Sequence, residues 1–349
     1  MRFTIDAALL KAALKCVSHS VSKSDSKELS CVKISARGGF VEIESNDLNT
    51  AMRKRVECAC EAEGSTLVPY SRLSQLITGF KGDVSIGADG GSASISCGKT
   101  CISLPTLSVD DWPSFSNVMS GQSAVMSSES FNDRIASLTH AVARTQKSNT
   151  VLEGINIAAS DGIATFEATD SYRVASMSCE CEGEINVIMP ASVFSPDFTG
   201  DVTIRSDGSK IEIDDGSTSV VSRCFEGRWP NVSTIIDKAD DASSSATIDS
   251  VELASCATIA SAVSLAMRIE FSGMSAKVSA SGKDGERMVG EVFCEVDGEF
   301  SVCVNAKYLI DCLSKCDGDV RIGFVGDRSP VFISDGRILE AIMPIRESR

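Results

Sequence analysis

The chain has 349 residues, a formal net charge of −15 and a hydrophobic share of 43%. This length is too great for a single hydrophobic core of ordinary size, and it suits two or three domains of roughly 100 to 150 residues each. No run reaches the roughly 18 apolar residues of a membrane helix, and the first residues lack a secretory signal, so we expect a cytoplasmic protein without a membrane partner. The negative charge disfavours a general nucleic-acid binder, although a local basic surface could still attract phosphates.

The chain contains fourteen cysteines, mostly inside apolar segments, which indicates reduced, buried thiols rather than a disulfide framework. Two pairs, Cys58/Cys60 and Cys179/Cys181, have the C-x-C spacing that places both thiols on one face of a strand and could provide half of a metal site. Only two histidines are present and no C-x-x-C occurs, so we expect neither a metal nor another cofactor.

A strand followed by a helix is predicted three times in the chain, over 3–21, 124–142 and 246–263. Apolar residues recur at helical spacing, as Leu10 and Leu14 do in the first copy. Polar residues suited to N-caps stand at the helix starts: Asp6, Ser128 and Asp249. Alternating strand patterns follow each copy, so one plan is repeated near the start of each third.

Each third continues with a second unit of strand, helix and strands. The second helices are predicted to begin at Pro69, Pro190 and Asn305, and the tripeptide "GDV" recurs at 82, 200 and 318. The repeats therefore predict an α+β chain of three domains, each built from two strand–helix–strands half-units. The predicted domains span 1–120, 121–241 and 242–349.

The stretch "DSYR", Asp170 to Arg173, sets an acid, a hydroxyl, a phenol and a guanidinium side by side, as catalytic sites often do. An acidic residue recurs at the corresponding turn in the other copies, in "ESND" (44–47) and at Asp284, so Asp170 is interpreted as a turn residue. The three residues from Ser171 onward are special to the middle copy. No nucleophile elbow, phosphate loop, zinc-protease motif or dinucleotide fingerprint occurs, so we predict a non-catalytic protein.

Three stretches carry a resemblance to a known family: "ATDSYRVA" (168–175), "RCFEGRWPNVSTII" (223–236) and "EAIMPIRESR" (340–349). With the threefold repeat, the whole chain resembles the bacterial sliding clamp family, the beta subunit of DNA polymerase III. The resemblance implies a DNA clamp fold and a head-to-tail homodimer whose six domains close around duplex DNA without sequence contacts, helices lining the hole and sheets outside. It also implies a processivity factor in DNA replication that tethers the replicative polymerase, the clamp loader and repair factors.

A basic lining of the hole is a further implication of the resemblance, since phosphates attract Lys and Arg. Lys11 and Lys15 lie four apart, on the side of the first helix away from Leu10 and Leu14. The predicted DNA-binding residues are Lys11, Lys15, Lys23, Arg72, Arg134, Arg144 and Lys147. The helix over 251–263 carries no Lys or Arg, so weak attraction to DNA is expected.

In the family, a pocket between the second and third domains receives a short peptide with apolar anchors. The residues carried over by motif are Leu152, Thr169, Ser171, Tyr172, Arg173, Val174, Pro230, Thr234, Ile235, Asn305, Tyr308, Ile342, Met343, Pro344, Ile345 and Arg346. Apolar and flexible Met surfaces accept Leu or Phe anchors, while a few polar groups fix the peptide backbone. Met343 and Ile345 have the alternative interpretation of core residues in a final strand.

For the seam of the ring, the resemblance indicates Ile102 and Leu104 on the first domain and Val263 and Leu265 on the third. The related two-domain type that forms trimeric rings, proliferating cell nuclear antigen, is disfavoured by chain length. A clamp-like accessory or decoy protein, which binds partner peptides without efficient loading on DNA, is kept as the alternative function.

Overall fold

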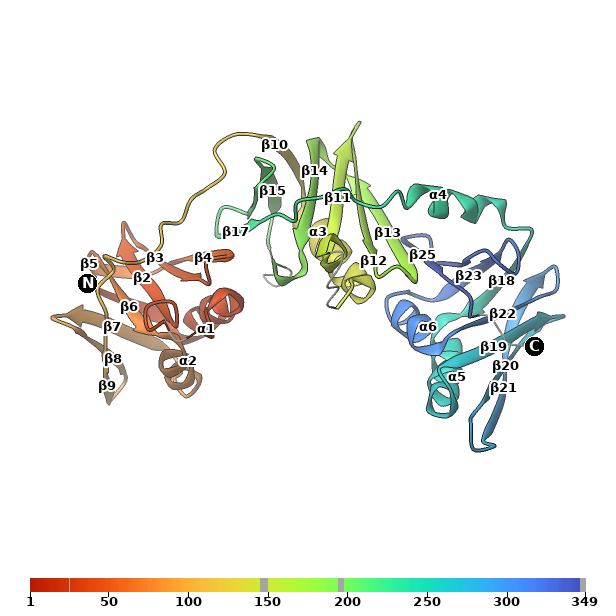
Figure 1. Cartoon of the computed structure of the whole chain (residues 1–349). Helices are drawn as coiled ribbons and strands as arrows, with labels where there is room; N and C mark the ends of the chain where they lie inside the picture. The colour runs from red at the N-terminus through yellow and green to blue at the C-terminus, as the bar shows by residue number, and fades with distance from the viewer. Residues whose placement is uncertain (25, 145–149, 194–197, 346–349) are drawn as a thin grey trace. The chain divides into compact units, whose positions relative to one another are not determined.

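The computed structural model describes residues 1–24, 26–144, 150–193 and 198–345 (Figure 1). By spatial contact the chain divides into two compact units, and the boundary passes through the middle third of the sequence. Unit 1 comprises 1–132, 159–162 and 181–226, and unit 2 comprises 133–158, 163–180 and 227–349. The boundaries of the three repeated domains stay a prediction from the sequence.

Unit 1 contains two antiparallel sheets. The first has the strand order β5 (Ala59–Ala62), β1 (Arg2–Asp6), β7 (Asp83–Asp89), β8 (Ser92–Cys97) and β9 (Thr100–Pro105). The second runs through β6 (Gly64–Pro69), β2 (Cys31–Arg37), β3 (Phe40–Asn46), β4 (Thr50–Glu57), β17 (Thr218–Arg223), β16 (Lys210–Asp214), β15 (Asp201–Ser206), β10 (Gln122–Ser127) and β14 (Glu182–Pro190). The pairing of β4 with β17 joins strands from the first and middle thirds into one sheet.

The helices of unit 1 follow the predicted apolar spacing. α1 (Ala7–Val17) lies beside α2 (Tyr70–Thr78) and against β3 and β4, as Figure 1 shows. Leu10, Leu14 and Val17 are buried on that side, which confirms the amphipathic prediction. α3 (Ser128–Leu138) begins in unit 1 and ends in unit 2, and β11 (Gly154–Ser160) also crosses the boundary.

Unit 2 has a comparable sheet that joins the middle third to the last. Its order is β12 (Ile163–Thr169), β13 (Arg173–Glu180), β25 (Ile338–Ile342), β24 (Val331–Ser334), β23 (Asp319–Phe324), β18 (Ser244–Asp249), β21 (Arg287–Asp297), β20 (Ser275–Ser281), β19 (Ala266–Ser272) and β22 (Phe300–Asn305). α5 (Ser250–Val263) packs beside α6 (Ala306–Leu313) and against β20 and β21 (Figure 1). The rings of Phe271 and Phe300 stack at 4.4 Å in the core beneath. α4 (Ser233–Ile236) is a single turn in the connecting segment.

The recurring "GDV" segments make the same local structure three times. Gly82, Gly200 and Gly318 all have a positive φ, between 68° and 75°, which favours glycine. Their carbonyls accept hydrogen bonds from the first turns of α1, α3 and α5, at 2.8, 2.8 and 3.1 Å. The repeat is therefore visible in backbone hydrogen bonds as well as in sequence.

Two of the three predicted N-caps are confirmed. Asp6 accepts from the Ala8 amide at 2.7 Å, and Asp249 accepts from the Glu252 amide at 2.8 Å. The prediction of Ser128 is wrong by one residue, because α3 begins at Ser128 and the hydroxyl of Ser127 accepts from the Ser130 amide at 3.2 Å.

The predicted α+β class with repeated clamp domains is confirmed by antiparallel sheets and a small number of short helices. The second helix of the middle third was predicted to begin at Pro190. The described residues directly after Pro190 form a 3-10 helix instead, Ala191–Val193. None of the described helices has the length and apolarity that a bilayer crossing requires.

Candidate functional site

A pocket of about 260 Å³ lies in unit 2, beside the pairing of β13 with β25. Its walls come from the turn before β13, the connecting segment around α4, and the end of β25. The lining residues are Leu152, Thr169, Ser171, Tyr172, Arg173, Val174, Pro230, Asn231, Val232, Ile235, Pro330, Ala341 and Met343. The lining is mainly apolar with a few polar groups, which suits a ligand with hydrophobic anchors.

The turn from Asp170 to Arg173 shapes one wall of the pocket. The Asp170 carboxylate accepts from the Tyr172 amide at 3.0 Å and from the Arg173 amide at 3.1 Å, as Asp does in turns. Ser171 takes a positive φ of 78°, which is uncommon for a residue with a side chain. The tight turn leaves Tyr172 62% exposed at the pocket. The interpretation of Asp170 as a turn residue agrees with this geometry.

Arg173 is buried, with 6% of its surface exposed, and its charge is neutralised inside unit 2. Its guanidinium donates to Asp170 and Asp311, both at 3.1 Å, and to the His140 carbonyl. It also lies 4.4 Å from the centre of the Tyr308 ring. Arg173 therefore holds the turn in place, and its guanidinium is already occupied by protein groups.

Tyr308 and Glu167 have shifted pKa values for the same principal reason. Burial raises the pKa of the Tyr308 phenol, and the negative charge of Asp170 adds to the shift. Burial also raises the pKa of the Glu167 carboxyl, against the opposing effect of the hydrogen bond from Asn156, which is 3.1 Å long. Of the two, Tyr308 contacts the turn, because its ring lies beneath the Arg173 guanidinium.

The final strand supplies the opposite wall. The Met343 amide donates to the Tyr172 carbonyl at 2.9 Å, which continues the β13–β25 ladder by one residue. Met343 is 42% exposed at the pocket, whereas Ile342 is fully buried in the core. The alternative of a core role in the final strand is therefore wrong for Met343, which faces the opening, while Ile345 is half-buried and also lies beyond the end of β25.

The structure places the predicted pocket residues in two groups. Those that line the pocket are Leu152, Thr169, Ser171, Tyr172, Arg173, Val174, Pro230, Ile235 and Met343. Those placed elsewhere are Thr234, Asn305, Tyr308, Ile342, Pro344 and Ile345, and Arg346 lies outside the described residues.

Several of these displaced residues have other structural roles. Thr234 is exposed and donates to the Asn231 carbonyl at 3.0 Å. Asn305 caps α6 by accepting from the Lys307 amide at 3.0 Å. The Ile345 amide donates to the Cys303 carbonyl at 2.7 Å, which ties the segment after β25 to β22. Thr234, Asn305 and Ile345 therefore do not line this cavity, and their part in peptide binding stays a prediction.

Four lining residues were missed: Asn231, Val232, Pro330 and Ala341. Asn231 and Val232 lie inside the quoted stretch "WPNVSTII", so the motif contained them without distinguishing them from Thr234. Pro330 had no signal in the sequence, because it reaches the pocket through the pairing of β24 with β25.

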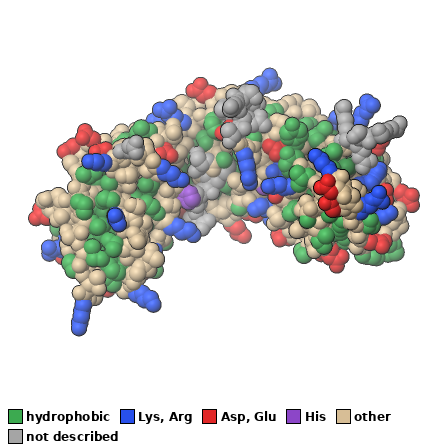
Figure 2. Space-filling model, turned by 60° about the horizontal axis from the view of Figure 1, so that its bottom comes forward, with side chains coloured by type: hydrophobic (Ala, Val, Ile, Leu, Met, Phe, Trp, Pro, Cys, Tyr) green, Lys and Arg blue, Asp and Glu red, His purple; other side chains and the backbone are tan. Residues whose placement is uncertain are grey.

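The predicted DNA-binding residues differ in how free their charges are. Lys11 donates to the Phe80 carbonyl at 2.8 Å. Arg134 bonds Asp133 and the Ser178 carbonyl, both at 3.1 Å, so its charge is offset locally. The exposed residues are Lys15, Lys23, Arg72 and Arg144, and Lys147 lies outside the described residues. Figure 2 shows the Lys and Arg side chains of one face as separate groups rather than as one continuous patch.

The predicted seam residues also divide. Leu104 is only 8% exposed and belongs to the core of unit 1, while Ile102 is half-buried on β9, the last strand of the five-stranded sheet. Val263 packs against the core of unit 2, whereas Leu265 is 55% exposed. The side chains of Leu104 and Val263 therefore pack mainly inside their own units.

His140 has a partner that sequence spacing did not reveal. Its Nε2 lies 2.7 Å from Glu340 Oε2, and its Nδ1 lies 2.8 Å from the Ser137 carbonyl. The pair is buried beside Cys312, so it holds the 3-10 turn Thr139–Ala141 against β25. Such burial leaves little access for a substrate, and the pair is structural.

Four of the fourteen cysteines are buried, namely Cys31, Cys179, Cys294 and Cys312, while nine are half-buried and Cys101 is exposed, so the prediction of buried thiols is confirmed only in part. Burial raises the pKa of the Cys31 thiol to about 11, which keeps it protonated. Within the described residues, no group of three His, Cys, Asp or Glu side chains is arranged to hold a metal ion.

Comparison with known proteins points to one family. The family model for the N-terminal domain of the DNA polymerase III beta subunit matches residues 1–116. The beta sliding clamp of Chlamydia muridarum is 26% identical over 372 residues, which cover 99% of each chain. The beta sliding clamp of Streptomyces coelicolor is 23% identical over 379 residues, which cover 100% of each chain.

The fold is shared with solved sliding clamps. The DNA polymerase sliding clamp of Bacillus subtilis matches with a TM-score of 0.89 and 20% identity over 100% of both chains. The sliding clamp of Pseudomonas aeruginosa bound to griselimycin matches with a TM-score of 0.90 and 20% identity, over 99% of this chain and 100% of that one. The chain is therefore similar over its full length to beta sliding clamps, its first third matches the family model of their N-terminal domain, and it shares the fold of the solved ones.

Proposed function

We propose that the protein is a non-catalytic processivity factor: two copies close into a ring around duplex DNA and tether the replicative polymerase, the clamp loader and repair factors through the unit 2 pocket. The observation that carries the proposal is the pocket beside β13 and β25, whose apolar opening is formed by Tyr172 and Met343. Similarity to sliding clamps over the full chain favours this function over the accessory or decoy alternative. Retention on closed circular DNA tests it.

Exposed strand edges support the proposed ring. β9 is the last strand of its sheet in unit 1. In unit 2, the part of β21 that pairs with β20 carries Val289 and Phe293, which are exposed, and Leu265 is exposed as well. Soluble proteins generally cover or charge such edges, because unpaired backbone groups invite pairing with another chain. A head-to-tail contact between the two edges that closes after two copies makes a ring.

Topology, rather than affinity, would hold such a ring on DNA. The chain carries a net charge of −15, and its exposed predicted lining consists of only a few residues, among them Lys15 and Arg72. Each neutralised phosphate adds to binding and to its salt dependence, so a sparse lining gives weak, mobile contact. Weak contact is compatible with sliding, because a closed ring does not need tight binding to remain linked to its polymer.

The chemistry of the pocket suits a short peptide. Met343 is flexible and adaptable, and Pro230 and Val174 provide rigid apolar walls. Tyr172 combines a ring surface with a hydroxyl at the opening. A Leu or Phe anchor could therefore be buried while its backbone is fixed by a few polar groups.

Replacing Met343 by alanine is expected to weaken binding of a labelled peptide with Leu and Phe anchors by about tenfold, because the pocket loses an apolar wall worth about 1.4 kcal/mol. Fluorescence anisotropy measures the affinity. Met274 is a matched control, since it is also an exposed methionine of unit 2 and lies in the turn between β19 and β20. Equal affinities of the Met343→Ala and Met274→Ala variants would contradict the assignment of the pocket.

A further inference from the structure

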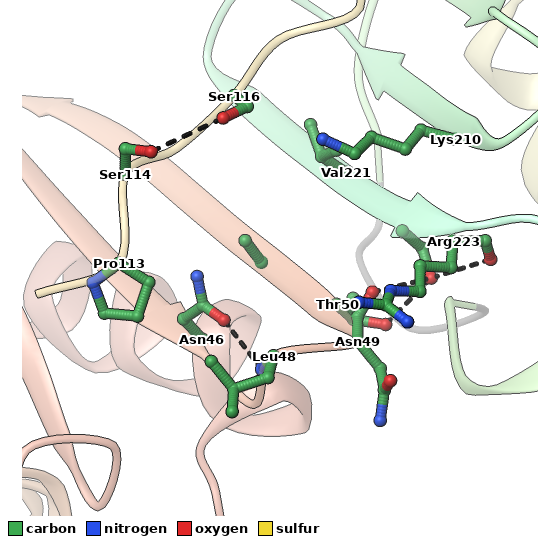
Figure 3. A pocket seen from close by; sticks show the side chains of 12 residues that line it. Asn46, Leu48, Asn49, Thr50, Pro113, Ser114, Ser116, Lys210, Val221 and Arg223 are labelled. Atoms are coloured by element: carbon green, nitrogen blue, oxygen red, sulfur yellow. Dashed lines mark hydrogen bonds between the residues drawn. The ribbon is translucent and has the colours of Figure 1, made fainter.

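A second pocket, of about 190 Å³, lies in unit 1 beside the pairing of β4 with β17 (Figure 3). Its walls come from the turn before β4, the connecting segment around Pro113, and the ends of β16 and β17. These are the same kinds of element that form the unit 2 pocket. The proposed function assigns nothing to this place.

The turn before β4 reproduces the turn before β13. Leu48 has a φ of 73° where Ser171 has 78°. The Asp47 carboxylate accepts from the Asn49 and Thr50 amides, at 3.0 and 2.7 Å, as Asp170 does from the two residues that follow Ser171. The two turns are therefore copies of one structure in different units.

The strand ladders also correspond. The Arg223 amide donates to the Asn49 carbonyl at 3.1 Å, just as the Met343 amide donates to the Tyr172 carbonyl at 2.9 Å. A Trp-Pro pair opens the connecting wall in both places, with Pro113 lining one pocket and Pro230 the other. The second pocket is therefore the repeat-related counterpart of the first.

The counterpart differs in chemistry at the positions that face the ligand. Arg223 stands where the first pocket has Met343, and Asn49 stands where it has Tyr172. Lys210 lines the pocket from the start of β16, opposite Arg223 in the β16–β17 ladder. Figure 3 shows the Lys210 side chain extending over Val221. Lys210 and Arg223 therefore take the place of the apolar wall of the unit 2 pocket, and Val221 and Pro113 provide a small apolar surface beside them.

The two cations are available to a ligand. Among the described residues, no side-chain ion pair or hydrogen bond joins the Lys210 ammonium or the Arg223 guanidinium to an acidic group. The nearby Asp207 carboxyl, whose pKa is lowered by hydrogen bonds from the Lys210 and Ser209 amides, also interacts with the Lys210 charge. Arg223 is exposed and Lys210 is half-buried. The exposed Asp207 offsets part of the Lys210 charge, while Arg223 adds a second cation, so the pocket carries positive charge in a chain whose net charge is −15.

We propose that this second pocket binds an extended acidic peptide segment of a partner protein, with Asp or Glu carboxylates on Arg223 and Lys210 and small side chains over Val221 and Pro113. The choice of a peptide rests on the proposed role of the related unit 2 pocket, and the choice of an acidic one rests on charge complementarity. A partner that carried both an apolar-anchor segment and an acidic segment would engage two related pockets of one chain.

The test uses a fluorescein-labelled decapeptide of alternating Glu and Ala and the full-length protein, at low salt. Lys210→Gln/Arg223→Gln is expected to lower the affinity by about tenfold or more, because two charge-assisted contacts are lost. Arg37→Gln/Lys99→Gln removes the same charge from exposed positions of unit 1 and is expected to leave the affinity within about twofold. A peptide of alternating Gln and Ala should bind at least about tenfold more weakly than the acidic one.

Equal losses in the two double variants would overturn the proposal, since general charge would then explain the binding. Absence of binding to the unmodified protein, or equal binding of the Glu and Gln peptides, would also overturn it. The apolar-anchor peptide separates this result from the proposed function. If that peptide fails at the Met343 pocket while the acidic peptide still depends on Arg223, only the proposed function is lost, and the reverse outcome removes only the second site.

Discussion

Replacing Arg173 by alanine is expected to destabilise unit 2 by about 3 kcal/mol, near the lower end of the range for breaking a buried ion pair. The substitution would leave the carboxylates of Asp170 and Asp311 without their cation and remove the group that stacks on Tyr308. The estimate stays at the lower end because Asp311 keeps 29% of its side chain exposed and water can solvate it.

Urea unfolding followed by tryptophan fluorescence measures this effect. The chain has two tryptophans, and Trp112 belongs to unit 1 while Trp229 belongs to unit 2, so a Trp112→Phe background reports on unit 2 alone. Lys277→Ala is the control, because its pair with Glu270 is 3.7 Å long and well exposed, and its loss should change stability by about 1 kcal/mol or less. If Arg173→Ala unfolded no earlier than Lys277→Ala, the guanidinium would be free for ligands after all.

Introducing a charge at the proposed seam is expected to separate the two copies of the ring. Leu265→Arg removes an exposed side chain whose burial would contribute about 1.5 to 3 kcal/mol and places an unpaired charge in the interface. Together these changes should raise the dissociation constant of the dimer by roughly a thousandfold, which corresponds to about 4 kcal/mol.

Sedimentation velocity gives the mass of the assembly directly. Met119→Arg is the control, because Met119 is also an exposed apolar side chain but lies in the segment before β10 and not on β9 or β21. The control should remain a dimer. A Leu265→Arg variant that kept the mass of two chains would place the seam elsewhere.

The sequence predicted the repeated architecture well, because repetition is recorded in local signals. The recurring "GDV" segments indicated the repeat, and the structure has the same positive-φ glycine at each of them. Asp6 and Asp249 were identifiable as caps because capping depends on residues two or three positions away. Ser127 was missed in favour of Ser128 because two consecutive serines satisfy the same local pattern.

Long-range contacts explain what the sequence could not predict. Arg173 was assigned to a ligand because its partners Asp311 and His140 lie 138 and 33 residues away. Pro330 and Ala341 reach the pocket through strand pairing, which no local pattern records. The second pocket did leave a signal, since the Trp-Pro pair at Pro113 repeats the pair at Pro230, but its meaning depends on seeing both turns in three dimensions.

Retention on DNA tests the central claim most directly. The protein is loaded onto nicked circular DNA by a clamp loader and then passed through a gel-filtration column at a salt concentration that screens phosphate contacts. A linked ring stays with the circular DNA and is lost when one restriction cut opens the circle, because it slides off the ends. Loss from the circle before cutting, or retention after cutting, would show that contact rather than linkage holds the protein and would contradict the ring.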